Sequence, residues 1–254
     1  MNTLVWSYDK KVRTDKYVEK TIDFYKASIR NAKQLGYKTV MYSNSNIFDN
    51  LVDEVHHIDG DYVFWDAFKF VPLLEREDEF CLIDGDLLLH KRLPTDKIDA
   101  DIIFDVTERR KFNWYYTTGV KLLDSLHIHT IIPEWKVLKT PVFNCGLLII
   151  RDKEFRKLYI DRWKTLHQFC KERMDIFSNK HFNELGKTNN EYLGTLTTIA
   201  AQYLLTILAY HYNKSWYNIR RDEKLPISDY YVHYIGAQKF HDDITGITLE
   251  KTIL

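Results

Sequence analysis

Short apolar runs alternate with longer segments of helical periodicity along this chain, and this alternation restricts the fold more than any other feature. The strand-like runs lie at residues 3–8, 37–43, 52–58, 79–86, 100–107 and 142–151. Apolar residues recur every three to four positions, as on one face of a helix, in the segments 15–35, 64–72, 152–173 and 191–213. Strands that alternate with helices predict an α/β fold with a mostly parallel sheet covered by helices on both faces.

Helix-end signals and loops refine this prediction. Gly36 follows the first helical segment as a C-cap glycine would, and Asp152 stands where an N-cap is expected. The stretches 107–140 and 174–190 interrupt the pattern, and loops of that length usually carry function. In a parallel sheet the ligand lies beyond the carboxyl ends of the strands, where the sequence places "WSYD" (6–9), "DGD" (84–86) and "NCG" (144–146).

The length and charge balance favour a single domain that does not bind nucleic acid. The chain has 254 residues, of which 45% are hydrophobic and 28% charged, and this suits one α/β domain over 1–254. Lys plus Arg and Asp plus Glu each total 36, so the formal net charge is zero. A general nucleic-acid binder would usually carry a basic excess, so that class of protein is disfavoured.

The cysteines and the apolar segments indicate a cytoplasmic protein without membrane insertion. Cys81, Cys145 and Cys170 form no CxxC pair, so we expect buried free thiols in a reducing compartment. The N-terminal apolar run is too short for a signal peptide. No segment approaches the roughly 20 apolar residues of a membrane helix. The sequence predicts no particular oligomeric state.

The stretch "CLIDGDLLLH" (81–90) carries the most informative motif. Asp-Gly between apolar runs is a strong hairpin signal, so Asp84 and Gly85 could simply form a turn. Alternatively, Asp84 and Asp86 would point to one face of an extended segment and bind a hard cation such as Mg²⁺ or Mn²⁺. Within the predicted strand 79–86, the run 80–83 directly before the motif is apolar throughout, as in an interior parallel strand, and this favours the metal site.

Three short motifs, taken in order, resemble the GT-A fold glycosyltransferases, most closely family 8, the retaining nucleotide-sugar transferases that include glycogenin. The segment 67–94 resembles their DxD region, "PVFNCGLLIIR" (141–151) their "FNxG" strand, and "YVHYIGAQKF" (231–240) their "HxxGxxKPW" element. The resemblance implies a single GT-A-like domain with a nucleotide-binding part at about 1–106 and an acceptor part at about 107–254. It also implies metal-dependent transfer, with retention, from a UDP-sugar to a glycan or protein hydroxyl.

The resemblance also implies roles for individual residues. Asp84, Asp86 and His233 would hold Mn²⁺ or, as the second choice, Mg²⁺, and Asp84, Asp86 and Lys239 would be the catalytic set. Donor-binding residues would be Trp6, Ser7 and Tyr8 near the base, Lys69, Gly85, Gly236 and Lys239 near the nucleotide and its phosphates, and Asn144 and Gly146 at the sugar. A metal ion and an ammonium group would stabilise the charge that develops on the departing phosphate.

The sequence departs from the family pattern at two places. The "KPW" ending is replaced by Lys239-Phe240-His241. The acidic element that the family carries on the sugar side is not clear, and Glu191 or the pair Ala201-Gln202 are the nearest candidates.

Residues 114–116, Trp-Tyr-Tyr, could form an aromatic platform for the acceptor, and Glu108 could reach the acceptor. The pairs His56-His57 and His127/His129 lack zinc-ligand spacing and are interpreted as structural or exposed.

Two other classes of function remain open from the sequence. A non-catalytic nucleotide-sugar-binding domain would keep the sheet and the site but lack turnover. A phosphohydrolase of the haloacid dehalogenase type also carries DxD on a strand, although its motif normally opens the chain, whereas about 80 residues precede Asp84 here. Release of the nucleotide would indicate the transferase, nucleotide binding without release would indicate the binding domain, and release of phosphate from an aryl phosphate would indicate the hydrolase.

Overall fold

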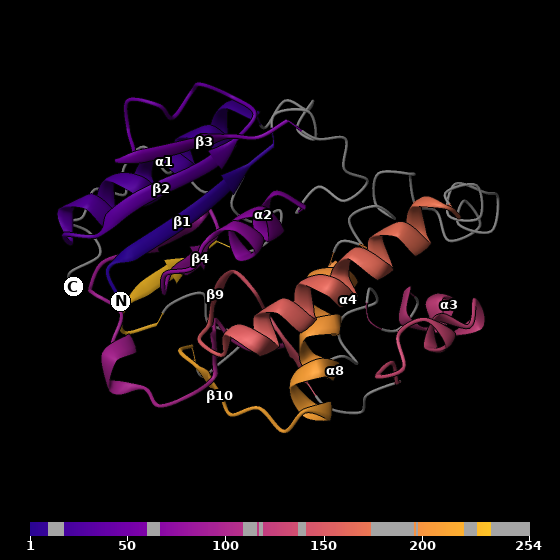
Figure 1. Ribbon diagram of the computed structural model, residues 1–254. Coiled ribbons are helices and arrows are strands. Elements are labelled where there is room, and N and C mark those ends of the chain that lie inside the picture. Colours follow the sequence, from indigo (N-terminus) through magenta and orange to yellow (C-terminus); the bar gives the residue numbers. More distant parts are fainter. Residues whose placement is uncertain are drawn as a thin grey trace.

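A seven-stranded sheet forms the centre of the computed structural model, which describes residues 1–9, 18–59, 67–108, 116, 119–136, 141–173, 196, 198–220 and 228–234. The strand order is β10-β6-β9-β4-β1-β2-β3 (Figure 1). All neighbours pair in parallel except β9, which is antiparallel to both β4 and β6. The strands are β1 (Thr3–Tyr8), β2 (Lys38–Ser43), β3 (Glu54–His57), β4 (Cys81–Ile83), β6 (Ile102–Phe104), β9 (Leu147–Ile150) and β10 (Trp216–Asn218).

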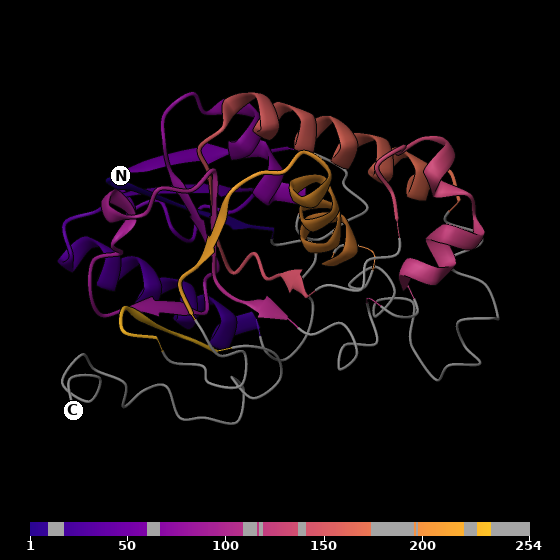
Figure 2. The same ribbon diagram turned by 90° about the horizontal axis from the view of Figure 1, so that it is seen from below.

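Helices cover both faces of this sheet, which confirms the predicted α/β class. Figure 2 shows α1 and α4 on opposite sides of the strands. The helices are α1 (Val18–Gln34), α2 (Ala67–Glu75), α3 (Val120–Ser125), α4 (Lys153–Lys171) and α8 (Leu204–His211), with a π-helical turn η5 (Ile199–Tyr203) before α8 and 3-10 turns η1 (Thr95–Lys97) and η4 (Ile128–Thr130). Two small antiparallel pairs complete the described part, β5 (Leu87–Leu89) with β11 (Tyr231–His233) and β7 (Thr107–Glu108) with β8 (Val142–Phe143).

The core is divided into two apolar clusters, one on each face. Within β1, Val5 belongs to the cluster beneath α2, α4 and α8, whereas Leu4 and Trp6 belong to the cluster beneath α1. Successive strand residues point to opposite faces, so a strand that is buried on both sides is apolar on both, as "LVW" (4–6) is. The three cysteines are buried free thiols, as expected. Within the described residues, no helix is long and apolar enough to span a membrane.

Local signals place the helix ends as predicted in two cases and wrongly in one. Gly36 has φ +74° after α1, the left-handed conformation of a C-cap glycine. The Asp152 side chain accepts a hydrogen bond from the Phe155 amide at 2.9 Å, so it is the N-cap of α4. The prediction that α2 ends at Pro72 was wrong, because the helix continues to Glu75; burial of Phe70 and Leu73 against the sheet stabilises it.

Three further predictions about secondary structure need correction. The run 142–151 is not one continuous strand but β8 and β9 in different sheets: the Asn144 amide still donates to Val106, whereas the neighbouring Asp105 amide donates to Leu147, so Cys145 and Gly146 interrupt the pairing. The stretch 107–140 contains β7 and α3. The edge strand β10 has no counterpart among the predicted elements, and its Trp216 and Tyr217 side chains are exposed.

Candidate metal and nucleotide site

The DGD motif forms a turn that joins strands of two different sheets. The amide of Leu87 donates to the carbonyl of Asp84 at 3.1 Å, which closes a β-turn over 84–87. However, β4 pairs with β1 and β9, whereas β5 pairs with β11. The motif is therefore a turn but not a hairpin, and it projects its carboxylates from the carboxyl end of the parallel strand β4.

Pairing of β5 with β11 brings His233 to this turn. His233 lies opposite Leu87 in the antiparallel register, and the amide of Tyr234 donates to the carbonyl of Asp86 at 3.0 Å. As a result, one potential ligand atom from each of Asp84, Asp86 and His233 lies within 4.8 Å of the others. The Nε2 atom of His233 is 3.5 Å from Oδ1 of Asp86. The structure thus brings together the three side chains that were predicted to bind a metal ion.

Two glycines permit this close packing. A Cβ atom on Gly146 would lie 2.1 Å from Cε1 of His233, and one on Gly85 would lie 2.2 Å from the Tyr25 ring. Gly85 was predicted near the phosphates of the donor and Gly146 at its sugar, and these roles stay predictions. In the structure, the imidazole of His233 packs on Gly146 and the phenol ring of Tyr25 packs on Gly85, so each glycine admits a side chain of the protein itself.

A buried carboxylate, Asp105, lies behind His233 and was not recognised from the sequence. It follows β6, is 0% exposed, and its Oδ2 is 2.6 Å from Nδ1 of His233. It also accepts hydrogen bonds from Arg220 and from the hydroxyl of Tyr231. Its position at a strand end was a visible signal, but its partners lie 115 to 128 residues away in the chain, beyond what local pattern can connect.

Charges in this cluster shift the pKa values of both His233 and Asp105. Burial alone would lower the pKa of His233, but the Asp105 and Asp86 carboxylates outweigh it and raise the pKa to about 10. Burial alone would raise the pKa of Asp105, but His233 and Arg220 hold it well below its usual range. The ring of His233 is therefore held beside negative charge on both nitrogens, an environment that favours a cation at Nε2.

Lys69 on α2 forms an ion pair with Asp84, so it lies beside a candidate metal ligand, and its contact with the nucleotide stays a prediction. The helix is fixed against α4 by Phe70, whose ring stacks on Trp163 with 4.1 Å between centroids.

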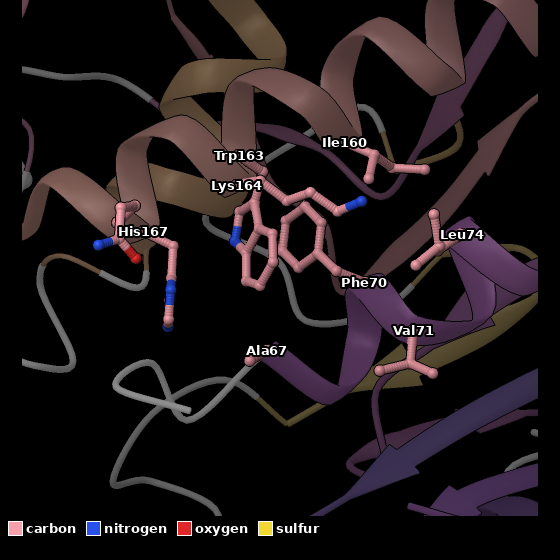
Figure 3. A pocket seen from close by; sticks show the side chains of 9 residues that line it. Ala67, Phe70, Val71, Leu74, Ile160, Trp163, Lys164 and His167 are labelled. Carbon is pink, nitrogen blue, oxygen red and sulfur yellow. The ribbon is translucent and has the colours of Figure 1, made fainter. Parts of the chain in front are cut away.

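An apolar groove of about 360 Å³ lies beside this contact between α2 and α4, with Leu74 and His167 among its lining residues (Figure 3). None of the three candidate metal ligands lines that groove.

The three side chains suit a divalent metal ion. Carboxylate oxygens are the ligands that Mg²⁺ and Mn²⁺ prefer, and Mn²⁺ also accepts imidazole readily. Asp84 and Asp86 are only partly buried, whereas His233 is 3% exposed. A site with a rigid inner ligand and two outer carboxylates could hold a cation and still leave it accessible to a second ligand.

A chain of hydrogen bonds leads from this site to Glu108. The carbonyl of Gly146 accepts from the Asp84 amide at 2.8 Å, and the Gly146 amide donates to the side-chain oxygen of Asn144 at 2.8 Å. The amide group of Asn144 then donates to Glu108 at 2.5 Å, and the Tyr116 hydroxyl donates to the other oxygen at 2.8 Å. Asn144 therefore lies beside the site, and together with Gly146 it connects Glu108 to the backbone of Asp84.

Residues predicted near the base and the acceptor have mixed positions. Trp6 and Tyr8 are buried, and Trp6 donates its indole N–H to Ser28 at 3.1 Å, so these two side chains belong to the core. Ser7 is partly exposed at the end of β1, and its donor-binding role remains a prediction. Tyr116 is 0% exposed, so it cannot be a surface platform. Lys239, Gly236, Glu191, Trp114 and Tyr115 lie outside the described residues.

No protein-family model and no curated protein matches the chain. Among solved structures, the glycosyltransferase GlyE of Streptococcus pneumoniae TIGR4 has a TM-score of 0.40 at 16% identity, over 88% of this chain and 45% of its own. The apo form of GlyE gives 0.38 at 16% identity, over 78% and 43%. Mouse xyloside xylosyltransferase 1 in its apo form gives 0.41 at 9% identity, over 85% and 84%. The chain spans less than half the length of GlyE.

Proposed function

We propose that this protein is a metal-dependent glycosyltransferase of the GT-A type that transfers a sugar from a UDP-sugar to a hydroxyl of a glycan or protein. One observation carries the proposal: Asp84, Asp86 and His233 converge at the carboxyl end of β4. This edge of a parallel sheet is where α/β proteins bind nucleotides. Resemblance of the DxD, FNxG and HxxG motifs to family 8 supports the choice of reaction.

In this proposal Asp84, Asp86 and His233 hold Mn²⁺, or Mg²⁺ as the second choice. The ion, when bound, supplies positive charge to the two phosphates of the donor. The ammonium group of Lys69, now paired with Asp84, adds a second positive charge at the same place. Lys239 has the corresponding role by its motif. Together these groups stabilise the charge on the departing nucleotide.

Glu108 is our candidate for the acidic residue on the sugar side, in place of Glu191. The side chains of Asn144 and Tyr116 orient both of its oxygens, and hydrogen bonds through Asn144 and Gly146 connect it to the backbone of Asp84. A carboxylate fixed in this way can accept hydrogen bonds from sugar hydroxyls and so orient the sugar for attack.

We propose retention of configuration at the sugar. The acceptor hydroxyl attacks the anomeric carbon on the face from which the nucleotide leaves, so one C–O bond forms as the other breaks. The proton of the acceptor hydroxyl passes to an oxygen of the departing phosphate. The residues of the chain then act by orientation and charge, without a covalent intermediate on a side chain.

A panel of nucleotide sugars with Mn²⁺, scored for nucleotide release with and without simple glycan acceptors, tests the proposal. We expect release from a UDP-sugar that Asp86→Asn abolishes. Asp96→Asn is the control, because Asp96 pairs with the N-terminal amine at the amino end of β1 and should leave release unchanged.

The outcomes separate this activity from the alternatives. UDP binding without release from any member of the panel would indicate a non-catalytic binding domain. Release of phosphate from an aryl phosphate would indicate a hydrolase. Release that survives Asp86→Asn at the wild-type level would contradict the metal role.

A further inference from the structure

Asp105 is a carboxylate buried in the protein next to His233, and its charge needs an explanation. Burial of an ionised carboxylate is costly unless it is paired and hydrogen-bonded. Arg220 supplies the pair through two contacts of 2.9 Å, and Tyr231 donates at 2.6 Å. Arg220 would satisfy the charge by itself, so the further contact with His233 at 2.6 Å is not needed for neutrality.

The contacts around Asp105 fix the orientation of its carboxylate. Its Oδ1 accepts from Arg220 Nε and the Tyr231 hydroxyl, while its Oδ2 accepts from Arg220 Nη2 and lies against Nδ1 of His233. Because both oxygens are engaged, the carboxylate cannot rotate without loss of several hydrogen bonds. It is a fixed acceptor at one defined place behind the imidazole.

This acceptor determines how His233 faces the aspartates. A hydrogen bond from Nδ1–H to Asp105 leaves Nε2 as the nitrogen on the side of Asp86, 3.5 Å from its Oδ1. The ring also packs closely on Gly146, since its Cε1 lies 2.1 Å from where a Cβ on that glycine would be. Metal-binding histidines commonly donate their second ring N–H to a carboxylate, which sets the tautomer and the ring orientation.

We propose that Asp105 is a positioning residue for the metal site: it fixes the imidazole of His233 so that Nε2 faces Asp84 and Asp86, and Arg220 and Tyr231 hold Asp105 for this role. This inference rests on the metal site in the proposed function. It adds that metal binding depends on a fourth residue, which touches neither the donor nor the metal ion, besides the three ligands.

The alternative is a purely structural ion pair, and the chain offers a matched control for it. Glu134 is also a buried carboxylate, 4% exposed, that binds an arginine through two contacts, with Arg162, and a tyrosine hydroxyl, with Tyr212. It has no hydrogen bond to any of the three metal ligands among the described contacts. Loss of stability should follow from neutralising either carboxylate, whereas loss of metal affinity should follow only from Asp105.

Titration of Mn²⁺ followed by electron paramagnetic resonance, which detects the free ion, measures that difference in the full chain. We expect Asp105→Asn to bind Mn²⁺ about 10- to 100-fold more weakly than the wild type, and Glu134→Gln to bind it equally well. Wild-type affinity in a folded Asp105→Asn protein would overturn the inference while the proposed function stood. Failure of the wild type itself to bind Mn²⁺ would overturn both.

Asp105→Asn could unfold the chain by leaving Arg220 unpaired, so a second measurement uses the wild type alone. Long-range ¹H–¹⁵N spectra of histidine-labelled protein with Zn²⁺, a diamagnetic stand-in, report which ring nitrogen carries the proton. His233→Gln identifies the signal by its disappearance. We expect a protonated Nδ1 and a proton-free Nε2. A proton-free Nδ1, or a His233 signal that Zn²⁺ leaves unchanged, would overturn the inference.

Discussion

Gly146→Ala offers a sharp test of the site, because the structure leaves no room for the added methyl group. The new Cβ would lie 2.1 Å from Cε1 of His233 and 2.9 Å from both ring nitrogens. Carbon atoms in contact prefer a separation of about 3.5–4.0 Å, so the ring must retreat by roughly 1.4 Å or more. It is tethered to Asp105 at 2.6 Å, and therefore it cannot retreat without loss of that bond.

The expected loss of Mn²⁺ affinity in Gly146→Ala follows from the narrow range of ligand distances that a metal site tolerates. Ligand distances in such sites are held to about 0.2 Å, far less than the displacement that the methyl group requires. We therefore expect Mn²⁺ affinity to fall at least as far as when a supporting residue is lost, about 10- to 100-fold. Overpacking should also lower the free energy of unfolding by about 1–3 kcal/mol.

Mn²⁺ titration and urea unfolding of the same preparation separate the two effects. Gly36→Ala is the control, because its positive φ of 74° strains any other residue and lowers stability by about 1 kcal/mol or more at a place with no contact to the metal ligands. We expect it to lose stability and keep its Mn²⁺ affinity. A folded Gly146→Ala protein with wild-type affinity would refute the reasoning about the ring position.

Three other perturbations have defined outcomes. Lys69→Met removes the cation paired with Asp84, and a nearby unit charge contributes about 1 kcal/mol. Mn²⁺ alone should therefore bind about fivefold more tightly, whereas UDP should bind more weakly in the presence of Mn²⁺. Calorimetry that shows neither change would contradict this position for Lys69. Burial would raise the pKa of Glu134, but Arg162 lowers it from 4.5 to about 2. The ionised carboxylate thus stabilises the fold above pH 4.5, and this stability is lost as the pH falls towards 2. In urea unfolding, the stability of Glu134→Gln should therefore fall less over this pH range than that of the wild type. Asp152→Ala should lower stability by about 1 kcal/mol through loss of the N-cap and leave UDP release unchanged; equal urea midpoints would show that the cap contributes nothing.

The sequence predicted those parts of the structure that depend on local pattern. The apolar runs and helical periods predict the α/β sheet with helices on both faces, because burial on one or two faces directly determines which residues a strand or helix can carry. Asp84 and Asp86 were accessible to prediction because they follow a fully apolar strand. His233 was identified only through its resemblance motif, since its place beside Asp86 depends on the pairing of β5 with β11.

Long-range packing explains what the sequence did not reveal. Asp105 acquires its role only when β6, β10 and β11 place Arg220, Tyr231 and His233 around it. Gly146 was predicted at the sugar of the donor, and that role stays a prediction; the contact of its backbone with the imidazole of His233 could not be predicted, because it joins distant parts of the chain. Contacts that join residues more than a hundred positions apart leave no periodic signal in the chain.

The central claim is that a metal ion held by Asp84, Asp86 and His233 binds the nucleotide. The most direct test measures how strongly nucleotide binding depends on the metal. Isothermal titration of UDP into the wild type and into Asp86→Asn, each with Mn²⁺ and with EDTA, separates the contribution of the ion from that of the protein surface. We predict that the wild type binds UDP with Mn²⁺ and that EDTA or Asp86→Asn removes most of this affinity. Equal UDP affinity with Mn²⁺ and with EDTA would contradict a metal ion held by Asp84, Asp86 and His233 as the centre of the site.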